Sequence, residues 1–215
     1  MTKIISMNFS YAKNSMQQRG IKLMNQFIPF TATYSMTDFN MPVCYSNNAD
    51  GIVPQSVEEF DLALSNADAF VFAISEMTSH YCATFKNALD WLVVKTNYNS
   101  TWGAGYSISN KPLVVVTFSP SYLEGNRHFE MTSQLLLKLE VDIRGTYCFN
   151  DCWEQVRPNN YYFVKKQSLE ILEKLLLPAN PNLPDLEENK HKSIAKKWQQ
   201  QYKEWDESWR KNNEE

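Results

Sequence analysis

Polar side chains cluster directly after the first apolar run of the chain. The segment Asn8–Gln17 is rich in hydroxyls and amides, and it leads into a stretch of helical periodicity from about Met16. Free N–H groups at a helix N-terminus bind anions, and hydroxyls add further donors, so a phosphate monoester suits such a segment. N-capping by Asn14 or Ser15 explains the same residues, and on this segment alone it is the simpler interpretation.

Several other chemistries have no support in the sequence. The six scattered glycines form neither Gly-x-Gly-x-x-Gly nor a Walker-type phosphate loop, and no Gly-x-Ser-x-Gly occurs. These absences disfavour a tightly bound dinucleotide, a kinase-type site and an esterase triad. Cys148 and Cys152 lack a second pair and the three histidines lie far apart, so we expect no metal site.

Five apolar runs alternate with segments of helical periodicity. The expected strands are Lys3–Met7, Thr31–Met36, Ala69–Ile74, Pro112–Ser119 and Val141–Phe149. The expected helices are Met16–Phe27, one from about Ser56, Ala83–Lys95, Arg127–Leu139 and Gln167–Leu177. Ser56-Val-Glu-Glu59 matches a capping box, which predicts the start of the second helix.

Strands that alternate with helices predict βαβ units and a parallel sheet. Right-handed crossovers leave the flavodoxin-like and Rossmann orders as the foremost topologies, and both place a ligand outside the carboxyl ends of the strands. We predict an α/β fold of the flavodoxin-like doubly wound type, with a five-stranded parallel sheet in the order 2-1-3-4-5. In this order the first, third and fourth strands adjoin, so the polar segments that follow them converge.

The segment after the third expected strand carries the most specific motif. It runs Ser75-Glu-Met-Thr-Ser-His-Tyr81 and leads into Lys86-Asn-Ala-Leu-Asp-Trp91. This pattern resembles the NAD(P)H-dependent FMN reductase family, which includes quinone, chromate and azo-dye reductases. The family carries Pro-Glu-Tyr-Asn-x-Ser followed by Leu-Lys-Asn-Ala-Leu-Asp-Trp, so the second part is reproduced intact and Glu76 falls on the family's Glu.

Weaker similarities extend the resemblance over about residues 3 to 145. The first polar segment is similar to the family's Gly-Ser-x-Arg-x-x-Ser-x-Asn, with Ser10, Ser15 and Gln17 on motif positions. The segment Ser119–Arg127 resembles its Ser-x-Gly-x-x-Gly-Gly-x-Arg. The departures are Phe9, Ala12, Ser75, Met77, Thr78 and Ser121, which replace Gly, Arg, Pro, Tyr, Asn and Gly.

The resemblance implies an FMN-dependent NAD(P)H oxidoreductase. NADPH or NADH would pass a hydride to flavin N5, and a quinone, free flavin or similar small electron acceptor would then take the electrons. The flavin carries this chemistry, so no catalytic side chain is expected. The implied cofactor-binding residues are Ser10, Tyr11, Ala12, Ser15, Met16, Gln17, Glu76, Met77, Thr78, Ser79, Ser119, Pro120, Ser121 and Tyr122.

The family picture also gives roles to individual groups near the flavin. A carboxylate facing the ring would oppose the anionic reduced flavin, so we expect Glu76 to turn away and accept backbone hydrogen bonds. The backbone N–H groups of Met77, Thr78 and Ser79 are expected to donate to the edge of the isoalloxazine. On the following helix, packing or subunit contact is the expected role of Ala88, Leu89 and Leu92.

The composition is that of an ordinary globular protein, 43% hydrophobic and 21% charged, with a net charge of −3. This balance does not indicate nucleic acid or an anionic membrane as a partner. No apolar run approaches the ~18 residues of a membrane span, and the N-terminus lacks the features of a signal peptide. We expect a cytoplasmic protein, and the resemblance implies a homodimer or homotetramer.

A Pro-rich break divides the chain near Pro178. We expect an FMN-binding domain over residues 1–177 and a C-terminal helical extension within residues 178–215. An aromatic stripe at helical spacing runs along this extension: Trp198, Tyr202, Trp205 and Trp209. It would pack on its own domain, across a dimer or against another protein. The competing function is therefore a non-catalytic flavodoxin-like interaction module with weakened or lost FMN binding.

Overall fold

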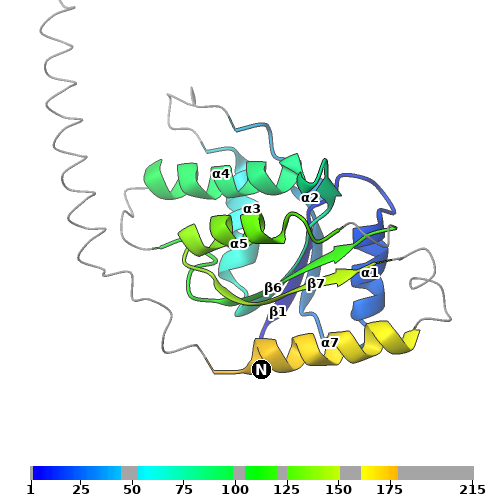
Figure 1. The fold of residues 1–215 in the computed structure, drawn as a ribbon. Coiled ribbons are helices and arrows are strands. Elements are labelled where there is room, and N and C mark those ends of the chain that lie inside the picture. The colour runs from blue at the N-terminus through cyan, green and yellow to red at the C-terminus, as the bar shows by residue number, and fades with distance from the viewer. Residues whose placement is uncertain (1, 45–52, 99–104, 121–124, 151–160, 179–215) are drawn as a thin grey trace, which may run out of the picture.

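Five parallel strands form the central sheet of the computed structural model, which describes residues 2–44, 53–98, 105–120, 125–150 and 161–178 (Figure 1). The strands are β1 (Ile4–Asn8), β2 (Ala32–Ser35), β3 (Ala69–Ala73), β6 (Pro112–Phe118) and β7 (Asp142–Phe149). They lie in the order β2-β1-β3-β6-β7, and every neighbouring pair is parallel. This is the order 2-1-3-4-5 along the chain, so the predicted flavodoxin-like fold is confirmed.

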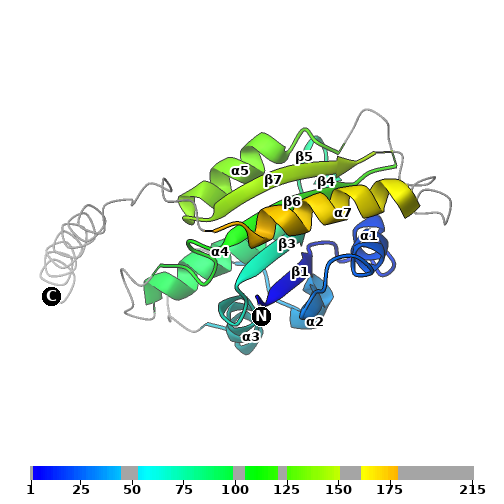
Figure 2. The same cartoon turned by 90° about the horizontal axis from the view of Figure 1, so that it is seen from below.

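Helices cover both faces of this sheet (Figure 2). They are α1 (Met16–Met24), α2 (Met36–Phe39), α3 (Gln55–Ser65), α4 (Ala83–Tyr98), α5 (Phe129–Lys138) and α7 (Tyr161–Leu176). The helices α1 and α7 pack on one face, while α3, α4 and α5 pack on the other. Because both faces are covered, β3 is buried along its whole length and its sequence is a continuous apolar run.

Alternate residues of the central strands enter the two cores. In β3, Val71 faces α1 and α7, whereas Phe70 and Phe72 face α3, α4 and α5. The approach of α1 to β6 is close, because a Cβ at Gly20 would lie 2.3 Å from the ring of Phe118. Glycine in the middle of α1 therefore sets how near this helix lies to the carboxyl end of β6.

The structure corrects several predicted helix boundaries. The first helix ends at Met24 and not at Phe27, and α7 begins at Tyr161, before the predicted Gln167. The capping box predicted at Ser56 is wrong, because α3 begins at Gln55 with Pro54 as its N-cap and no side-chain cap. Proline at a helix start supplies a suitable φ without a side-chain bond, and Pro54 has φ −59°.

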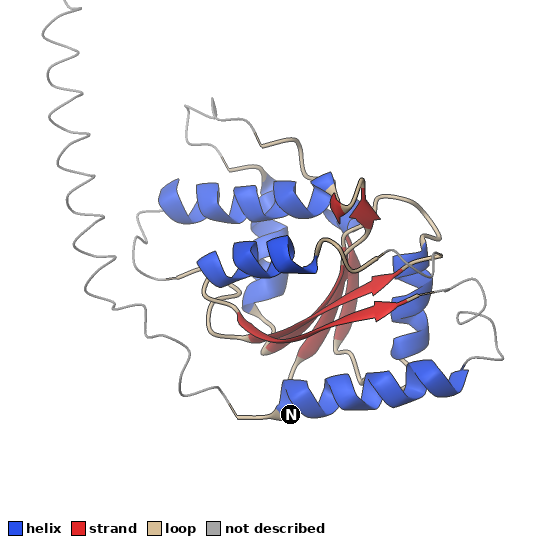
Figure 3. Ribbon diagram, viewed as in Figure 1, coloured by secondary structure: helices blue, strands red, loops and turns tan. Residues whose placement is uncertain are grey.

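Two short elements were not predicted from the sequence. One is the four-residue helix α2, in which the N–H of Ser35 donates to the Asp38 carboxylate at 2.7 Å. The other is a hairpin of β4 (Glu76–Met77) and β5 (His80–Tyr81), drawn as the small pair of red arrows in Figure 3. Elements of two to four residues are too short to show a hydrophobic period.

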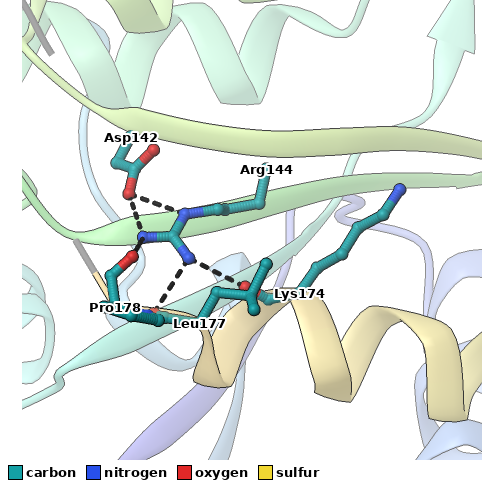
Figure 4. A network of polar contacts seen from close by, with 5 residues as sticks. All are labelled: Asp142, Arg144, Lys174, Leu177 and Pro178. Carbon is teal, nitrogen blue, oxygen red and sulfur yellow. Dashed lines mark hydrogen bonds and ion pairs between the residues drawn. The ribbon is translucent and has the colours of Figure 1, made fainter. Parts of the chain in front are cut away.

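The amino edge of the sheet is closed by cationic side chains. Figure 4 shows Arg144, at the start of β7, donating to the carbonyls of Lys174, Leu177 and Pro178 at 2.9–3.0 Å. Its Nε also donates to Asp142 at 2.7 Å, and both side chains are at least nine-tenths buried. A cation that bonds the last carbonyls of a helix satisfies groups that have no partner within the helix, so Arg144 caps α7.

A second cationic side chain, Lys111, bonds the last carbonyls of α3. Lys111 lies directly before β6, and its Nζ donates to the carbonyls of Leu64 and Ser65 at 3.0 and 3.1 Å. Burial lowers the pKa of this ammonium, while Asp68 and Asp61 act in the opposite direction. Two helix C-termini at this edge are thus bonded by side chains of the protein itself.

Three further expectations from the sequence concern membrane spans, metal ligands and the C-terminal stripe. No helix among the described residues is long and apolar enough to cross a membrane. Within the same residues, no cluster of three or more metal-ligating side chains is found. Cys152 and the C-terminal aromatic stripe fall on residues that the structure does not describe.

Candidate functional site

Three loops meet at the carboxyl edge of the sheet, where the ends of β1, β3 and β6 lie side by side (Figure 2). Asn8 pairs with Ala73, and Ala73 pairs with Val116. The ladder continues past the strand ends, because Phe9 N–H donates to Ala73 O and Ile74 N–H donates to Val116 O, both at 3.0 Å. The predicted convergence of the three loops is confirmed. They are called the first loop (9–15), the second loop (74–79) and the third loop (119–127).

The first loop ends in the N-cap of α1. The Oγ of Ser15 accepts from the N–H of Gln18 at 3.1 Å, so the capping interpretation of Ser15 is confirmed. The N–H groups of Met16 and Gln17 precede this donor, and an α-helix provides them with no internal acceptor. Capping and anion binding therefore do not compete here, because the cap uses one donor and two others face the same helix end.

The remainder of the first loop is held by side-chain oxygens. Ser10 N–H donates to Asn8 Oδ1 at 3.0 Å, and Ala12 N–H donates to Ser10 Oγ at 3.2 Å. In this contact the Ser10 hydroxyl accepts, and a hydroxyl also carries one proton to donate. Tyr11 is 43% exposed, so the loop presents an aromatic side chain at the edge of the site.

Gln17 connects the first loop to the third through its side chain. Its amide Nε2 donates to the carbonyl of Phe118 at 3.0 Å, and the N–H of Phe118 donates to its Oε1 at 2.9 Å. This paired contact is buried and fastens α1 to the carboxyl end of β6. The amide is thus engaged within the protein, and the backbone N–H is the group of Gln17 that remains for a ligand.

Glu76 connects the second loop to the third. Its carboxylate accepts hydrogen bonds from the N–H groups of Gly125 and Arg127 at 2.9 and 3.0 Å, as the sequence analysis expected. The Arg127 guanidinium donates in turn to Ser79 Oγ at 3.0 Å. Gly125 has φ +114°, and a Cβ there would lie 2.7 Å from the Cβ of Ser119, so this position requires glycine.

The second loop contains a strained turn. Thr78 and Ser79 have φ of 51° and 61°, and they are the two central residues between the paired Met77 and His80. Two positive φ values suit a two-residue hairpin, but they are costly for a β-branched threonine. The turn leaves the N–H groups of Thr78 and Ser79 outside the short ladder, and Met77 beside them is 59% exposed. Backbone strain of this kind clusters at ligand sites.

Phe9 stands where the resemblance places a glycine, and its side chain turns into the core. The ring is fully buried between Phe72 and Phe85, with centroid distances of 5.0 and 5.1 Å and edge-on geometry. Its carbonyl accepts hydrogen bonds from the Thr84 hydroxyl and from Cys82 Sγ. The first loop is therefore also fastened to the start of α4.

The Lys86–Trp91 block acts in packing, as predicted. Trp91 Nε1 and Asn87 Nδ2 both donate to the carbonyl of Pro42, at 2.8 and 2.9 Å. Asn87 Oδ1 also accepts from the N–H of Cys44 at 2.7 Å. The apolar residues of this helix face are buried: Ala88, Leu89 and Leu92. The motif residues Asn87 and Trp91 thus hold the segment before residue 45 against α4.

A buried polar chain beneath the second and third loops was missed by sequence reasoning. Thr117 Oγ1 donates to the carbonyl of Ile74 at 2.9 Å and lies 2.7 Å from His128 Nε2. His128 Nδ1 lies 2.9 Å from Thr132 Oγ1. Burial lowers the pKa of His128 to about 4, with Glu76 acting against this shift. His128 and Thr132 are four positions apart, one helical turn, whereas Thr117 and Ile74 lie on β6 and after β3, so no local sequence pattern shows that these four residues are in contact.

The third loop is described only in part. Ser119 is buried and its N–H donates to Phe149 O at 3.0 Å, while Pro120 is exposed. Ser121 and Tyr122 lie outside the described residues. Next to this loop, burial raises the pKa of Cys148 to about 11, with Glu76 adding to the shift, so the thiol is protonated at neutral pH.

Comparison with solved structures shows the same fold at low sequence identity. FerB, a flavoenzyme NAD(P)H:(acceptor) oxidoreductase from Paracoccus denitrificans, is 17% identical over 81% of this chain and 97% of its own, with a TM-score of 0.58. NAD(P)H:quinone oxidoreductase from Methanothermobacter marburgensis is 16% identical over 80% and 98%, with a TM-score of 0.57. An FMN-dependent NADH-azoreductase from Bacillus anthracis, in complex with FMN, is 11% identical over 80% and 100%, with a TM-score of 0.52.

Comparison with curated proteins gives no match. The family model of NADPH-dependent FMN reductase matches residues 3–150, which contain all three loops. This match covers more than half of the chain and confirms the resemblance drawn from the motifs. It also confirms the enzyme class and the FMN and NAD(P)H cofactors that the resemblance implied. The chain belongs to the NADPH-dependent FMN reductase family.

Proposed function

We propose that this chain is an FMN-dependent NAD(P)H oxidoreductase that binds FMN across the three loops at the carboxyl edge of the sheet. The observation that carries the proposal is the set of hydrogen bonds that joins these loops while leaving backbone donors on two of them. Gln17 joins the first loop to the third, and Glu76 joins the second to the third. A ligand held by all three loops would meet a site whose parts are already fixed relative to one another.

The first loop and the start of α1 suit the phosphate of FMN. The N–H groups of Met16 and Gln17, with the hydroxyls of Ser10 and Ser15, form a donor set at the positive end of a helix dipole. A phosphate monoester accepts such bonds through several oxygens. Ala12 stands at the position of the family's Arg, so helix-end donors take a larger share of the binding in this chain.

The second loop suits the flavin ring. The N–H groups of Thr78 and Ser79 are suited to donate to the polar edge of the isoalloxazine, while exposed Tyr11 and Met77 are apolar surface that a planar ring would cover. FMN, when bound, supplies the transfer of electrons from NAD(P)H to a small acceptor. The bonds of Glu76 to the third loop keep its charge engaged with backbone N–H groups.

Finer expectations belong to the same proposal. They are hydride transfer through flavin N5, a quinone or flavin acceptor, a homodimer or homotetramer and a cytoplasmic location. The division into an FMN-binding domain over 1–177 and an extension over 178–215 is likewise proposed. The site would also include Pro120, Ser121 and Tyr122 of the third loop. The stated activity of the NAD(P)H:quinone oxidoreductase from Methanothermobacter marburgensis supports a quinone as acceptor.

The proposal is tested by incubating the purified full chain with FMN, removing free flavin and recording the absorption spectrum. We expect flavin bands to remain with the protein, and anaerobic NADPH or NADH to bleach them, with the faster donor identifying the preferred nucleotide. Return of the bands on adding a quinone would support the acceptor class. Protein without flavin bands would contradict the proposal and favour the non-catalytic module.

A further inference from the structure

His128 is the most deeply placed titratable group near the three loops, and the proposed chemistry does not use it. Its side chain is fully buried, at 0% exposure, and so is that of Thr132. Thr117, 1% exposed, completes a chain of three buried side chains. Buried polar groups of this kind are costly unless each is hydrogen-bonded, so their bonding pattern is informative.

The hydroxyl and ring protons of these three side chains can be assigned by counting hydrogen-bond donors. Thr117 carries a single hydroxyl proton, and the Ile74 carbonyl at 2.9 Å can only accept, so that proton is directed to Ile74. The Thr117 oxygen then accepts from His128 Nε2 at 2.7 Å, which must carry a proton. In a neutral ring Nδ1 is left as an acceptor, and the Thr132 hydroxyl at 2.9 Å donates to it.

The row of hydrogen bonds from Thr132 through His128 and Thr117 ends at Ile74, which is the first residue of the second loop. Ile74 lies between β3 and the hairpin, and β6 holds both of its backbone polar groups. Its N–H donates to the carbonyl of Val116 at 3.0 Å, and its carbonyl accepts from Thr117. Two residues later Glu76 bonds the third loop, and four residues later begins the strained turn at Thr78 and Ser79.

We propose that His128 is a positioning residue for the candidate flavin site, acting in its neutral Nε2–H form through Thr117 on the Ile74 carbonyl. The inference rests on the proposed function only in naming flavin as the ligand. A strained turn persists when the surrounding structure fixes it. The His128 ring, at the N-cap of α5, fixes the start of the second loop, and the bonds of Glu76 to the third loop fix its next residues.

A direct role for His128 in proton transfer does not fit this geometry. Both ring nitrogens are bonded to threonine hydroxyls, and the side chain has no exposed surface. The charged and titratable groups near it are Glu76 and His80. A general acid must reach the group that it protonates, directly or through one water, whereas His128 reaches the loop only through Thr117.

The test compares two amide variants of His128, one with its N–H at the position of Nε2 and the other with its N–H at the position of Nδ1. His128→Gln keeps an N–H donor at the reach of Nε2, whereas His128→Asn keeps an amide only at the reach of Nδ1. Thr117→Val removes the hydroxyl between His128 and Ile74 without changing the shape. Val164→Ala, a core truncation in α7 on the other face of the sheet, is the control for general destabilisation.

The main readout is amide hydrogen exchange of residues 74–77 in the flavin-free full chain, because the N–H of Ile74 is bonded to Val116 and Met77 lies in the hairpin ladder. We expect exchange about tenfold faster in His128→Asn and Thr117→Val, and within about threefold of wild type in His128→Gln. Exchange in β1 should change less than that of the loop. Equal acceleration of the loop in Val164→Ala, or no difference between the Gln and Asn variants, would overturn the positioning role.

Two further readouts separate this inference from the proposed function. Nitrogen NMR of the His128 ring should show a protonated Nε2 and a bare Nδ1 at neutral pH, and a protonated Nδ1 would overturn the assignment. FMN affinity should fall about tenfold in the Asn variant and recover in the Gln variant. If the wild type binds no FMN, the proposed function fails, while exchange and NMR still decide the role of His128.

Discussion

The two edges of the central sheet differ in what bonds the backbone groups at the helix ends, which have no partner within the helix. At the amino edge the C-terminal ends of α3 and α7 present carbonyl groups, and Lys111 and Arg144 bond them. At the carboxyl edge the start of α1 presents N–H groups, and Ser15 caps one of them. The first edge is closed by cations of the protein, while the second has helix-end N–H groups that we propose bind a ligand.

The difference follows from the direction of the helices in a doubly wound fold. Parallel strands joined by right-handed crossovers bring helix N-termini to the carboxyl edge and helix C-termini to the amino edge. The positive ends of the helix dipoles therefore gather where anions bind, and the negative ends gather where cations stabilise. Stability and binding are thus separated in space, and substitutions at the two edges should have different effects.

The largest expected effect is on stability, at the amino edge. Replacing Arg144→Met leaves Asp142 buried without its ion-pair partner and removes bonds to three carbonyls. We expect the free energy of unfolding to fall by about 3–5 kcal/mol in urea titrations, with FMN affinity of the folded protein unchanged. The control is Lys86→Met, which breaks the exposed pair with Asp90 and should cost less than about 1 kcal/mol. Equal costs would contradict the comparison.

The next effect is a pH dependence at the carboxyl edge. Burial lowers the pKa of His128 to about 4 from an ordinary 6.5, so the unfolded chain binds the additional proton between these values. Stability is therefore complete above pH 6.5 and is lost as the pH falls toward 4, by up to about 3 kcal/mol. His128→Gln should remove this part of the pH dependence in urea titrations across the same range. Parallel curves for the two proteins would show that His128 does not contribute.

Ser15 separates capping from anion binding. Ser15→Ala should lower the free energy of unfolding by about 1 kcal/mol and weaken FMN binding about tenfold, because the residue caps α1 and faces the proposed phosphate. Ser15→Asp keeps a good cap but places a negative charge beside the phosphate. It should retain stability and lose more FMN affinity than the alanine variant. Retained affinity in Ser15→Asp would place the phosphate elsewhere.

The smallest expected effect is a gain in stability. Thr78→Asn replaces a β-branched residue at φ 51° with one that accepts this backbone conformation, so the free energy of unfolding should rise by up to about 1 kcal/mol. Thr37→Asn, in α2, is the control and should give no gain, since Thr37 does not have a positive φ. A thermal unfolding midpoint unchanged in Thr78→Asn would show that the turn stores little strain.

The fold was largely predictable because burial on both faces dictates the strand sequences. The run Ala69–Ile74 is apolar throughout, and its strand β3 lies at the centre of the sheet. The family motif after it identified the second loop, and simple electrostatics predicted that Glu76 accepts backbone bonds. The hairpin that begins at Glu76 was missed because its strands have two residues each and its turn lacks the usual Asn-Gly.

The contacts that join the loops were not predictable, because they link residues that only the fold brings together. Gln17 and Phe118 are 101 positions apart, and a motif position alone gave Gln17 the role of a ligand contact. His128 had no identified partner in the sequence, whereas in the structure Thr117 and Thr132 bond both of its ring nitrogens. Local patterns thus identified the loops, and tertiary structure determined which atoms face outward.

We propose that the N–H groups at the start of α1 bind the phosphate of FMN. Titration of the flavin-free full chain with FMN and with riboflavin, which lacks the phosphate, tests it most directly. We expect FMN to bind at least about a hundredfold more tightly, and Ser15→Asp to remove most of this preference. Equal affinity for the two flavins would show that these N–H groups do not bind the phosphate.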